Sequence, residues 1–590
     1  MARRTDSPAT EPTDWVTRAA DDAVRHAGGD PRDAGVAAAF AEAGTVVTCA
    51  SGISPSGPIH LGNLREFLTV HLVVEELRRR GVPTRHLHSW DDFDRFRKVP
   101  AGVDPSWATH VGRPLSAVPD PWECHASWAE HFKAPLRAAL AEMGCTMEEV
   151  DQTERYTAGA YTDQVLHAIE RRDAIEAVLA RHRTKKPVAD DVPADVPAEE
   201  AAVLEDSVAQ DDEPTQGGDL ARFPYKPFCR TCGRDTVTLT SYDDATTDLA
   251  YTCDSCGDSH VTNVRTQPEG KLVWKVDWPM RWSVEGVDFE PGGVDHASPG
   301  SSYTVGKEIV KLYGGRAPSF VGYSFVGVAG MAKMSSSKGG VPTAADALRV
   351  LEAPVLRWLY ARRQPKQAFT VDFGPEVVRL YDEWDALGRK AADPAKRDAQ
   401  VLAFERASAT SSAGTLPTPP VVVPFRTLSS IADVTAGSAD QISRLVGDLG
   451  HEHSSVADLE PRLSRAITWT HEFVPAEDRT TVRTTPDREL LAGLGDLERQ
   501  WLHLFLEHLP SAWTDGSPDL DRVTTVVYGV PKLARGLGLD DQPTDEVKAD
   551  QKAFFRLLYR LLVGAERGPR LPTLVLALGP ETVSSLVQGA

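Results

Sequence analysis

The sequence predicts an α/β fold: a Rossmann-like nucleotide-binding domain that carries insertions and a zinc ribbon, followed by a mainly α-helical C-terminal region. Three observations predict this architecture. A buried strand, a glycine-rich loop and an amphipathic helix follow one another between residues 45 and 80. Two CxxC pairs lie between residues 229 and 256. Helical patterns dominate the chain after Ala344.

The first α/β unit can be assigned element by element. Thr45–Ala50 is an apolar run typical of a buried strand, and Gly52–Pro58 supplies Gly, Ser and Pro for a tight loop. Apolar residues then recur at helical spacing over Leu64–Leu77, until Gly81 ends the predicted helix. Thr84–Trp90 is predicted to be the second strand, and it leads into two aspartates.

The later chain divides by composition. Between residues 188 and 220 there is no Lys or Arg, which predicts a flexible acidic insertion, with a functional acidic arm as the alternative. Leu272–Val276 and Phe320–Val328 are predicted to be strands. The expected organisation is a disordered tail over 1–12, an α/β domain over 13–343 that contains a cysteine module over 225–262, a helical region over 344–407, a linker over 408–424 and a helical domain over 425–590.

Composition restricts the class of protein. A chain of 590 residues is long enough for several domains. Its 85 Asp and Glu outnumber its 64 Lys and Arg, and the net charge of −21 has the wrong sign for indiscriminate nucleic-acid binding, so we expect no DNA partner. No segment approaches about 18 consecutive apolar residues, so we expect no membrane contact and a cytoplasmic location. Seven cysteines are too few for a disulfide scaffold.

The glycine-rich loop has the composition of a phosphate site. It runs from Ser51 to Asn63, and its last residues open the helix, where free N–H groups and the positive end of the helix dipole favour a phosphate chain. Gly57 and Gly62 let a nucleotide approach the backbone, and His60 can donate a hydrogen bond to phosphate oxygens. Alone, this pattern is equally compatible with a helix-start histidine that has no catalytic task.

A second polar loop lies far downstream, at Lys333-Met334-Ser335-Ser336-Ser337-Lys338. Two lysines in a flexible Ser- and Gly-rich loop can move onto a pyrophosphate leaving group and stabilise charge where it develops. Alone, the segment is also compatible with an ordinary polar loop.

Together and in this order, the two loops resemble the HIGH and KMSKS motifs of class I aminoacyl-tRNA synthetases. The first motif corresponds to His60–Asn63 and the second to Lys333–Ser337. This sequence departs from the motifs at Asn63 and at Ser336, which displaces the second lysine of the family, and Lys338 is the candidate substitute.

Four stretches, two of which contain these motifs, resemble the class I lysyl-tRNA synthetases in particular. They are Ser51–Asn63, Ser89–Pro100, Trp274–Trp282 and Lys333–Gly339, and the resemblance extends from about Trp15 to Asp385. It implies an enzyme that activates L-lysine with ATP and Mg²⁺ and transfers it to tRNA(Lys). It also implies that residues 344–407 contact the acceptor stem and that the domain over 425–590 binds the anticodon.

The resemblance also implies site residues. It assigns catalysis to His60, Asn63, Lys333 and Lys338, and ATP binding to Gly57, His60, Gly62, Asn63, Lys333, Ser335, Ser336, Ser337 and Lys338. The lysine pocket maps onto Gly52, Ser54, Trp274, His296 and Tyr323, with Tyr323 as the partner of the side-chain nitrogen. For each of these aromatic side chains taken alone, packing in the core is the alternative.

Cys229, Cys232, Cys253 and Cys256 form a CxxC…CxxC array with a hairpin-length spacer. Four thiolates at this spacing predict a tetrahedral structural zinc site. Because protein supplies all four ligands, no position remains for an activated water, and the zinc is expected to brace the fold or contact the acceptor stem.

A second candidate metal site lies within Pro119–His131. If a helix starts near Pro121, Cys124 and His131 lie two turns apart on one face, and Asp120 and His125 can reach the same point. This mixed set of oxygen, sulfur and nitrogen ligands suits zinc, while the alternative is a group of polar residues at a helix start. The lysyl subgroup has a metal at matching positions, so the resemblance implies a second zinc here.

Three alternative functions stay open at this point. The enzyme could charge glutamate, which requires a cationic partner in the pocket, or cysteine, which requires zinc there. A non-catalytic zinc-ribbon protein that binds RNA is the third, although both nucleotide loops carry residues able to act.

Overall fold

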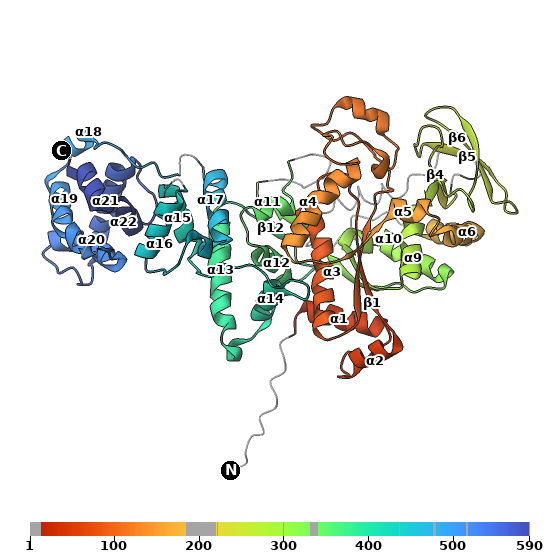
Figure 1. Ribbon diagram of the computed structural model, residues 1–590, viewed down its shortest axis with the longest axis horizontal. Helices are drawn as coiled ribbons and strands as arrows, with labels where there is room; N and C mark the ends of the chain where they lie inside the picture. The colour runs from red at the N-terminus through yellow and green to blue at the C-terminus, as the bar shows by residue number, and fades with distance from the viewer. Residues whose placement is uncertain are drawn as a thin grey trace, which may run out of the picture. The chain divides into compact units, whose positions relative to one another are not determined.

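The computed structural model describes residues 13–183, 220, 222–298, 300–330, 340–435, 437–475, 479–514 and 517–588 (Figure 1). Three predicted segments lie outside the described residues: the N-terminal tail, nearly all of the acidic insertion, and the second polar loop, over 331–339. No described helix combines the length and the apolar character that crossing a membrane requires. The chain forms two compact units: unit 1 comprises residues 1–348, 353–372 and 387–416, and unit 2 comprises 349–352, 373–386 and 417–590.

Unit 1 is built on a five-stranded parallel sheet, which confirms the Rossmann-like prediction. The strand order is β10-β9-β1-β2-β3. From β1 the chain adds β2 and β3 on one side, and it later adds β9 and β10 on the other side. The strands are β1 (Val47–Ile53), β2 (Thr84–Trp90), β3 (Glu148–Asp151), β9 (Val287–Gly293) and β10 (Ser319–Tyr323).

Helix α3 (Leu61–Arg79) follows β1 and packs against β1 and β2 (Figure 1). Its predicted apolar positions are buried, and Gly81 adopts a φ of +75°, which a side chain disfavours, just past its end. The second predicted strand has the bounds of β2. The first strand begins and ends later than predicted, because the pairing with β2 extends from Val47 to Ile53.

Two strand predictions were wrong in part. Of Leu272–Val276, only Leu272 lies in a strand, and Trp274 begins helix α9 (Trp274–Glu285). The tryptophans at 274, 278 and 282 recur every four residues, which is a helical spacing. The run Phe320–Val328 divides between β10 and β11 (Val326–Val328), which pair with different partners.

The other elements of unit 1 surround this sheet. Its further helices are α1 (Trp15–His26), α2 (Val36–Ala43), α4 (Trp128–Glu142), α5 (Gln152–Thr157), α6 (Thr162–Glu170), α7 (Arg172–Arg183), α10 (Ser302–Ile309), α11 (Ala344–Leu348), α12 (Ala353–Ala361) and α14 (Ala399–Ser408). Its further strands are β4 (Tyr225–Pro227), β5 (Val237–Tyr242), β6 (Asp248–Cys253), β7 (Ser259–Asn263), β8 (Gly270–Leu272), β11, β12 (Phe369–Val371), β13 (Ala409–Thr410) and β14 (Gly414–Thr415). The cysteine module is the antiparallel β5-β6-β7 sheet with the β4–β8 pair.

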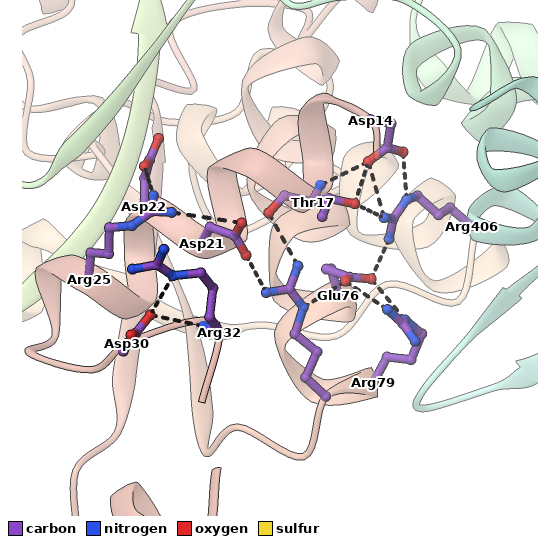
Figure 2. Close-up of polar contacts among 11 residues, drawn as sticks. Asp14, Thr17, Asp21, Asp22, Arg25, Asp30, Arg32, Glu76, Arg79 and Arg406 are labelled. Atoms are coloured by element: carbon purple, nitrogen blue, oxygen red, sulfur yellow. Dashed lines mark hydrogen bonds and ion pairs between the residues drawn. The ribbon is translucent and has the colours of Figure 1, made fainter. Parts of the chain in front are cut away.

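A buried network of charges joins the start of the chain to α14. Figure 2 shows Arg406 of α14 reaching Asp14, the N-cap of α1, and Glu76 of α3. The Arg406 guanidinium lies 2.8 Å from the Asp14 carboxylate and 2.6 Å from that of Glu76. Burial raises the pKa of Glu76, but hydrogen bonds from Arg79 and Arg406 outweigh it and hold that pKa at about 2. Removing one member of such a buried pair typically costs about 3–5 kcal/mol.

Unit 2 is mainly helical, as the sequence predicts for the C-terminal region. Its described elements are α15 (Phe425–Thr435), α16 (Ala439–Asp448), α17 (Arg462–Phe473), α18 (Arg488–Ala492), α19 (Asp496–His508), α20 (Leu520–Ala534), α21 (Asp545–Val563), α22 (Leu571–Gln588) and the short strands β15 (Trp513–Thr514) and β16 (Ser517–Pro518). Helix α13 (Glu376–Ala391) contributes residues to both units. Inside unit 2, the fully buried Arg462 forms ion pairs with Glu352 and Asp385.

Candidate active site

A cavity of about 290 Å³ lies where the sheet strands end. Because the strands are parallel, the carboxyl ends of β1, β2, β9 and β10 meet at one edge, and ligands of open α/β sheets bind at this edge. Residues that line the cavity come from all four strand ends, among them Gly52, Asp91, Gly292 and Tyr323. The cavity therefore has the position expected of a nucleotide-fold substrate site.

The structure brings the expected amino-acid pocket together. Gly52, Ser54, Trp274, His296 and Tyr323 all line this cavity, although they are spread over residues 52–323 of the sequence. Among the expected nucleotide-binding residues, Asn63 lines the cavity as well. Gly57, His60 and Gly62 lie in the adjoining loop and first turn of α3, outside the lining.

One wall of the cavity is aromatic. Trp274 and Trp278, one turn apart on α9, stack with ring centroids 5.3 Å apart and an interplanar angle of 12°. Trp278 in turn contacts Trp282 at 5.0 Å and the His296 ring at 5.6 Å. A flat wall of this kind provides apolar contact for the methylene groups of a ligand.

Glu66 of α3 is a buried carboxylate that lines the same cavity. It accepts hydrogen bonds from the Tyr323 hydroxyl and from the backbone N–H of Gly52. Burial raises the pKa of Glu66 well above its ordinary value, and burial together with the charge of Glu66 raises the pKa of Tyr323. The Tyr323 hydroxyl therefore stays protonated, and its polar contact in this structure is with Glu66.

Glu290 of β9 is a second buried carboxylate in the lining. Its two oxygens accept hydrogen bonds from the indole N–H groups of Trp278, at 3.0 Å, and Trp282, at 2.6 Å. Burial raises the pKa of Glu290 to about 7, against the opposing effect of these two hydrogen bonds.

His60 caps helix α3. Its Nδ1 accepts a hydrogen bond from the N–H of Gly62 at 3.1 Å, and the Asn63 side chain accepts one from the N–H of His60 at 3.2 Å. Burial lowers the pKa of His60 to about 4, so the ring is neutral at pH 7. With Nδ1 acting as acceptor, the proton lies on Nε2, which can donate to a ligand oxygen.

The four cysteines of the module have the geometry of a zinc site. Their sulfur atoms all lie within 4.8 Å of one another, with Cys229 and Cys256 at 3.7 Å and Cys232 and Cys253 at 3.6 Å. A tetrahedron with Zn–S bonds of about 2.3 Å has sulfur–sulfur edges of about 3.8 Å. The donor set and its spacing therefore fit a tetrahedral zinc ion.

Asp120, Cys124, His125 and His131 also converge, with ligand atoms within 4.8 Å of one another. The predicted helix start near Pro121 was wrong, because α4 begins at Trp128 behind the N-cap Ser127. Asp120 instead accepts backbone hydrogen bonds from Trp122, Cys124 and His125, which holds the preceding turns together. The Cys124 sulfur lies 3.1 Å from Nδ1 of His125 and 3.3 Å from Nδ1 of His131, spacings that also fit a bound metal. Among the residues that the structure describes, neither cysteine-containing cluster lines the cavity.

Some predicted residues cannot be located and some site residues were missed. Lys333, Ser335, Ser336, Ser337 and Lys338 lie outside the described residues.

The sequence did not predict Glu66 and Glu290 as site residues. Glu66 follows Asn63 by one helical turn and lies between the apolar positions Leu64 and Phe67, and this placement was the available signal.

Several known proteins are similar to this chain. The family model described as tRNA synthetases class I (K) matches residues 15–411. A lysine–tRNA ligase of Streptomyces coelicolor is 50% identical over 593 residues and covers 98% of each chain. One of Thermococcus kodakarensis is 33% identical over 550 residues, which is 90% of this chain and 94% of that protein. A solved glutamate tRNA ligase of Elizabethkingia meningosepticum matches over 92% of this chain and 98% of its own, at 14% identity and a TM-score of 0.40.

Proposed function

Because the chain belongs to the family of class I (K) tRNA synthetases, we propose that it activates L-lysine with ATP and transfers the lysyl group to tRNA(Lys). The lining of the cavity at the sheet edge is the observation that supports lysine as the amino acid. It combines an aromatic wall with two buried carboxylates, Glu66 and Glu290, that form no ion pair within the described residues. A cationic group on a methylene stem complements such a site.

The same cavity disfavours the two competing amino acids. A glutamate side chain would place its carboxylate beside two buried acidic groups, Glu66 and Glu290, neither of which could balance its charge. A cysteine enzyme would need a metal in the pocket, and neither of the two clusters described above lines it. Lysine is therefore the substrate that the charge of the cavity supports.

The reaction would proceed in two steps. In the first, a carboxylate oxygen of lysine attacks the α-phosphorus of ATP, the bond to the bridging oxygen of the β-phosphate breaks, and pyrophosphate leaves. In the second, the terminal 2′-hydroxyl of the tRNA attacks the lysyl carbonyl carbon and AMP leaves. Mg²⁺ carried by the ATP would neutralise phosphate charge.

The residues of this chain would mainly position and stabilise. Gly52 and Ser54 would hold the reacting end of lysine, Trp274 and His296 would contact its stem, and Tyr323 would act together with Glu66 on an ammonium group. His60, as a neutral donor through Nε2, would hydrogen-bond the phosphate oxygens as charge develops. From the sequence motif, Lys333 and Lys338 would neutralise the pyrophosphate.

The remaining assignments rest on the family. Zinc ions would occupy the Cys229, Cys232, Cys253 and Cys256 site and the Asp120, Cys124, His125 and His131 site, where they would brace the fold. The helical region over 344–407 would contact the acceptor stem, and the domain over 425–590 would bind the anticodon. Because tRNA charging serves translation, the protein would act in the cytoplasm.

Pyrophosphate exchange in the presence of tRNA(Lys), tested with each of the twenty amino acids, examines the proposal. Lysine should be the amino acid that supports exchange. Exchange with glutamate or cysteine instead would transfer the activity to that amino acid. Absence of exchange with every amino acid, in a protein that still binds tRNA, would indicate a non-catalytic RNA-binding protein.

A further inference from the structure

The guanidinium of Arg65 joins the second turn of α3 to two segments that lie far away in the sequence. Arg65 is 3% exposed, and its pKa, lowered by burial to about 10, leaves the group charged at pH 7. Its Nη1 donates a hydrogen bond to the carbonyl oxygen of Ser324 at 2.9 Å. Its Nη2 lies 3.0, 2.7 and 3.0 Å from the carbonyl oxygens of Gln364, Pro365 and Gln367. One buried side chain therefore holds both segments against α3.

These two segments are the ones that carry strand β11. Ser324 connects β10 to β11, and residues 364–367 lie just before β12, which pairs with β11. The ring of Phe369, in β12, has its centroid 5.2 Å from Cζ of Arg65. The N–H of Ser324 donates to the carbonyl oxygen of Pro365 at 2.9 Å, which ties the two segments to each other. Arg65 thus fixes the β11–β12 pair against α3.

Strand β11 depends on such contacts because it does not belong to the five-stranded sheet. It pairs with β12 in a separate two-stranded sheet and packs against α3. Tyr323, at the end of β10, is held differently, by the pairing of β10 with Gly293 of β9 and by its hydrogen bond to Glu66. Loss of the Arg65 contacts would therefore displace β11 and leave Tyr323 in place.

The residues on both sides of the second polar loop are attached to the start of α3. Strand β11 ends just before this loop, over 331–339, and Arg65 holds that side. On the other side, the N–H of Leu61 donates to the carbonyl oxygen of Pro342 at 3.1 Å, and His60 forms a β-bridge with Thr343. The first two turns of α3 therefore link the two nucleotide motifs.

We propose that Arg65 is a positioning residue for lysine activation, which holds β11 against α3 and so sets the place from which Lys333 acts on the pyrophosphate near His60. The inference rests on the proposed function, which assigns Lys333 and His60 to the phosphates. Arg65 is not among the described residues that line the cavity, so it acts through β11. Because reaction rates depend on ångström-scale placement of the reacting groups, losing this contact slows activation without weakening lysine binding.

Arg65→Lys in the full-length protein tests this assignment, because it keeps the charge but has one nitrogen in place of the two that contact different segments. With tRNA(Lys) present, kcat of lysine-dependent pyrophosphate exchange should decrease about ten- to a hundredfold, while the Kd of lysine measured by calorimetry stays unchanged. Native-state hydrogen exchange should become faster in peptides from β11 and stay unchanged in those from β9. Arg79→Lys, at the end of α3 and paired with Glu76, is the matched control and should alter none of these quantities.

A double-mutant cycle with Lys333→Ala separates positioning from general damage to the fold. If Arg65 acts through Lys333, Arg65→Lys should slow exchange much less in the Lys333→Ala background than in the unaltered protein. Equal slowing in both backgrounds would overturn the inference, and so would an unchanged kcat in Arg65→Lys or a loss of lysine affinity as large as the loss of rate. Failure of the proposed function has a different signature, since the unaltered protein would then show no lysine-dependent exchange.

If Arg65→Lys fails to fold, Ser324→Ala decides. This substitution removes the hydroxyl that donates to the carbonyl oxygen of Lys366 at 2.7 Å, so it loosens the same contact and keeps Arg65. A smaller decrease in kcat is expected, again reduced in the Lys333→Ala background, with lysine affinity unchanged. An unaltered rate of exchange in Ser324→Ala would then refute the assignment.

Discussion

Three buried histidines of unit 1 predict that this unit loses stability in mild acid. His71 of α3 and His86 and His88 of β2 are at most 1% exposed, and they cluster around the ring of Phe67. The Ser51 hydroxyl lies 2.7 Å from His88 Nδ1 and 3.2 Å from His86 Nε2, whereas neither nitrogen of His71 has a hydrogen-bond partner among the described residues.

The sign and size follow from proton linkage. Burial lowers the pKa of His86 to about 3 and the pKa values of His71 and His88 well below their ordinary value. The folded state therefore keeps these rings neutral, while in the unfolded chain they bind protons near pH 6.5, so the free energy of unfolding decreases as the pH falls through 6.5. At pH 5.5, one pH unit below the ordinary pKa, each histidine costs about 1 kcal/mol, and the three together a few kcal/mol.

His71→Phe isolates one third of this effect. The substitution replaces a buried ring without hydrogen bonds by another ring, so the stability lost between pH 7.5 and 5.5 should decrease by about 1 kcal/mol. Other titrating groups contribute equally to both proteins and cancel in the difference. The protein is titrated with urea at the two pH values, and the unfolded fraction is labelled by a hydrogen-exchange pulse at one fixed pH. Mass spectrometry of peptides from α3 and β2 then measures the unfolding of unit 1 alone.

A matched control is His503→Phe, because His503 is exposed and lies on α19 of unit 2. It should leave the pH dependence of unit 1 unchanged. An identical loss of stability in His71→Phe and in the unaltered protein would refute the reasoning, since it would mean that His71 is protonated in the folded state or that acid acts elsewhere.

Three further predictions concern the site and the cysteine module. Tyr323→Phe removes the hydroxyl that donates to Glu66 and should weaken lysine binding about tenfold with ATP binding unchanged; a neutral result in a lysine titration would reduce Tyr323 to packing. Lys333→Ala and Lys338→Ala should each slow activation by roughly ten- to a thousandfold while lysine binding changes little; normal pyrophosphate exchange in the Lys338 variant would show that another residue replaces the displaced family lysine. Metal analysis should find zinc, and Cys253→Ser should loosen the β5–β7 module before it lowers adenylate formation; full charging by metal-free protein contradicts this.

Local pattern predicted the elements that position the site. The helix over Leu64–Leu77 and the strand over Thr84–Trp90 are correct because their apolar residues repeat at the period of one element. The start of Trp274–Trp282 was assigned to a strand although it begins helix α9. The aromatic and β-branched residues there favour strands, and this preference was given more weight than the helical four-residue spacing of the tryptophans. The recognised motifs led to Gly52, Ser54 and Tyr323, which converge in the cavity.

The missing information was long-range. Glu290 lies in a strand whose neighbours are known only once the sheet order is known, and its partners Trp278 and Trp282 come from the preceding helix. Asp120 holds the candidate metal-binding cluster together by accepting backbone hydrogen bonds from Trp122, Cys124 and His125. The spacing of side chains along the sequence does not reveal such bonds. Sequence pattern therefore predicted elements and motifs better than it predicted which charges end up without a partner.

The ion pairs of Arg406 set an order of events during synthesis of the chain. Arg406 follows Glu76 by 330 positions and Asp14 by 392. At about 5–20 residues per second, a ribosome reaches Arg406 roughly 15–65 s after it has added Glu76. In that interval α1 and α3 can already pack, and Glu76 already has Arg79 and Arg80, but Asp14 still lacks its guanidinium partner. Unit 1 of a nascent chain thus lacks this ion pair until α14 has emerged.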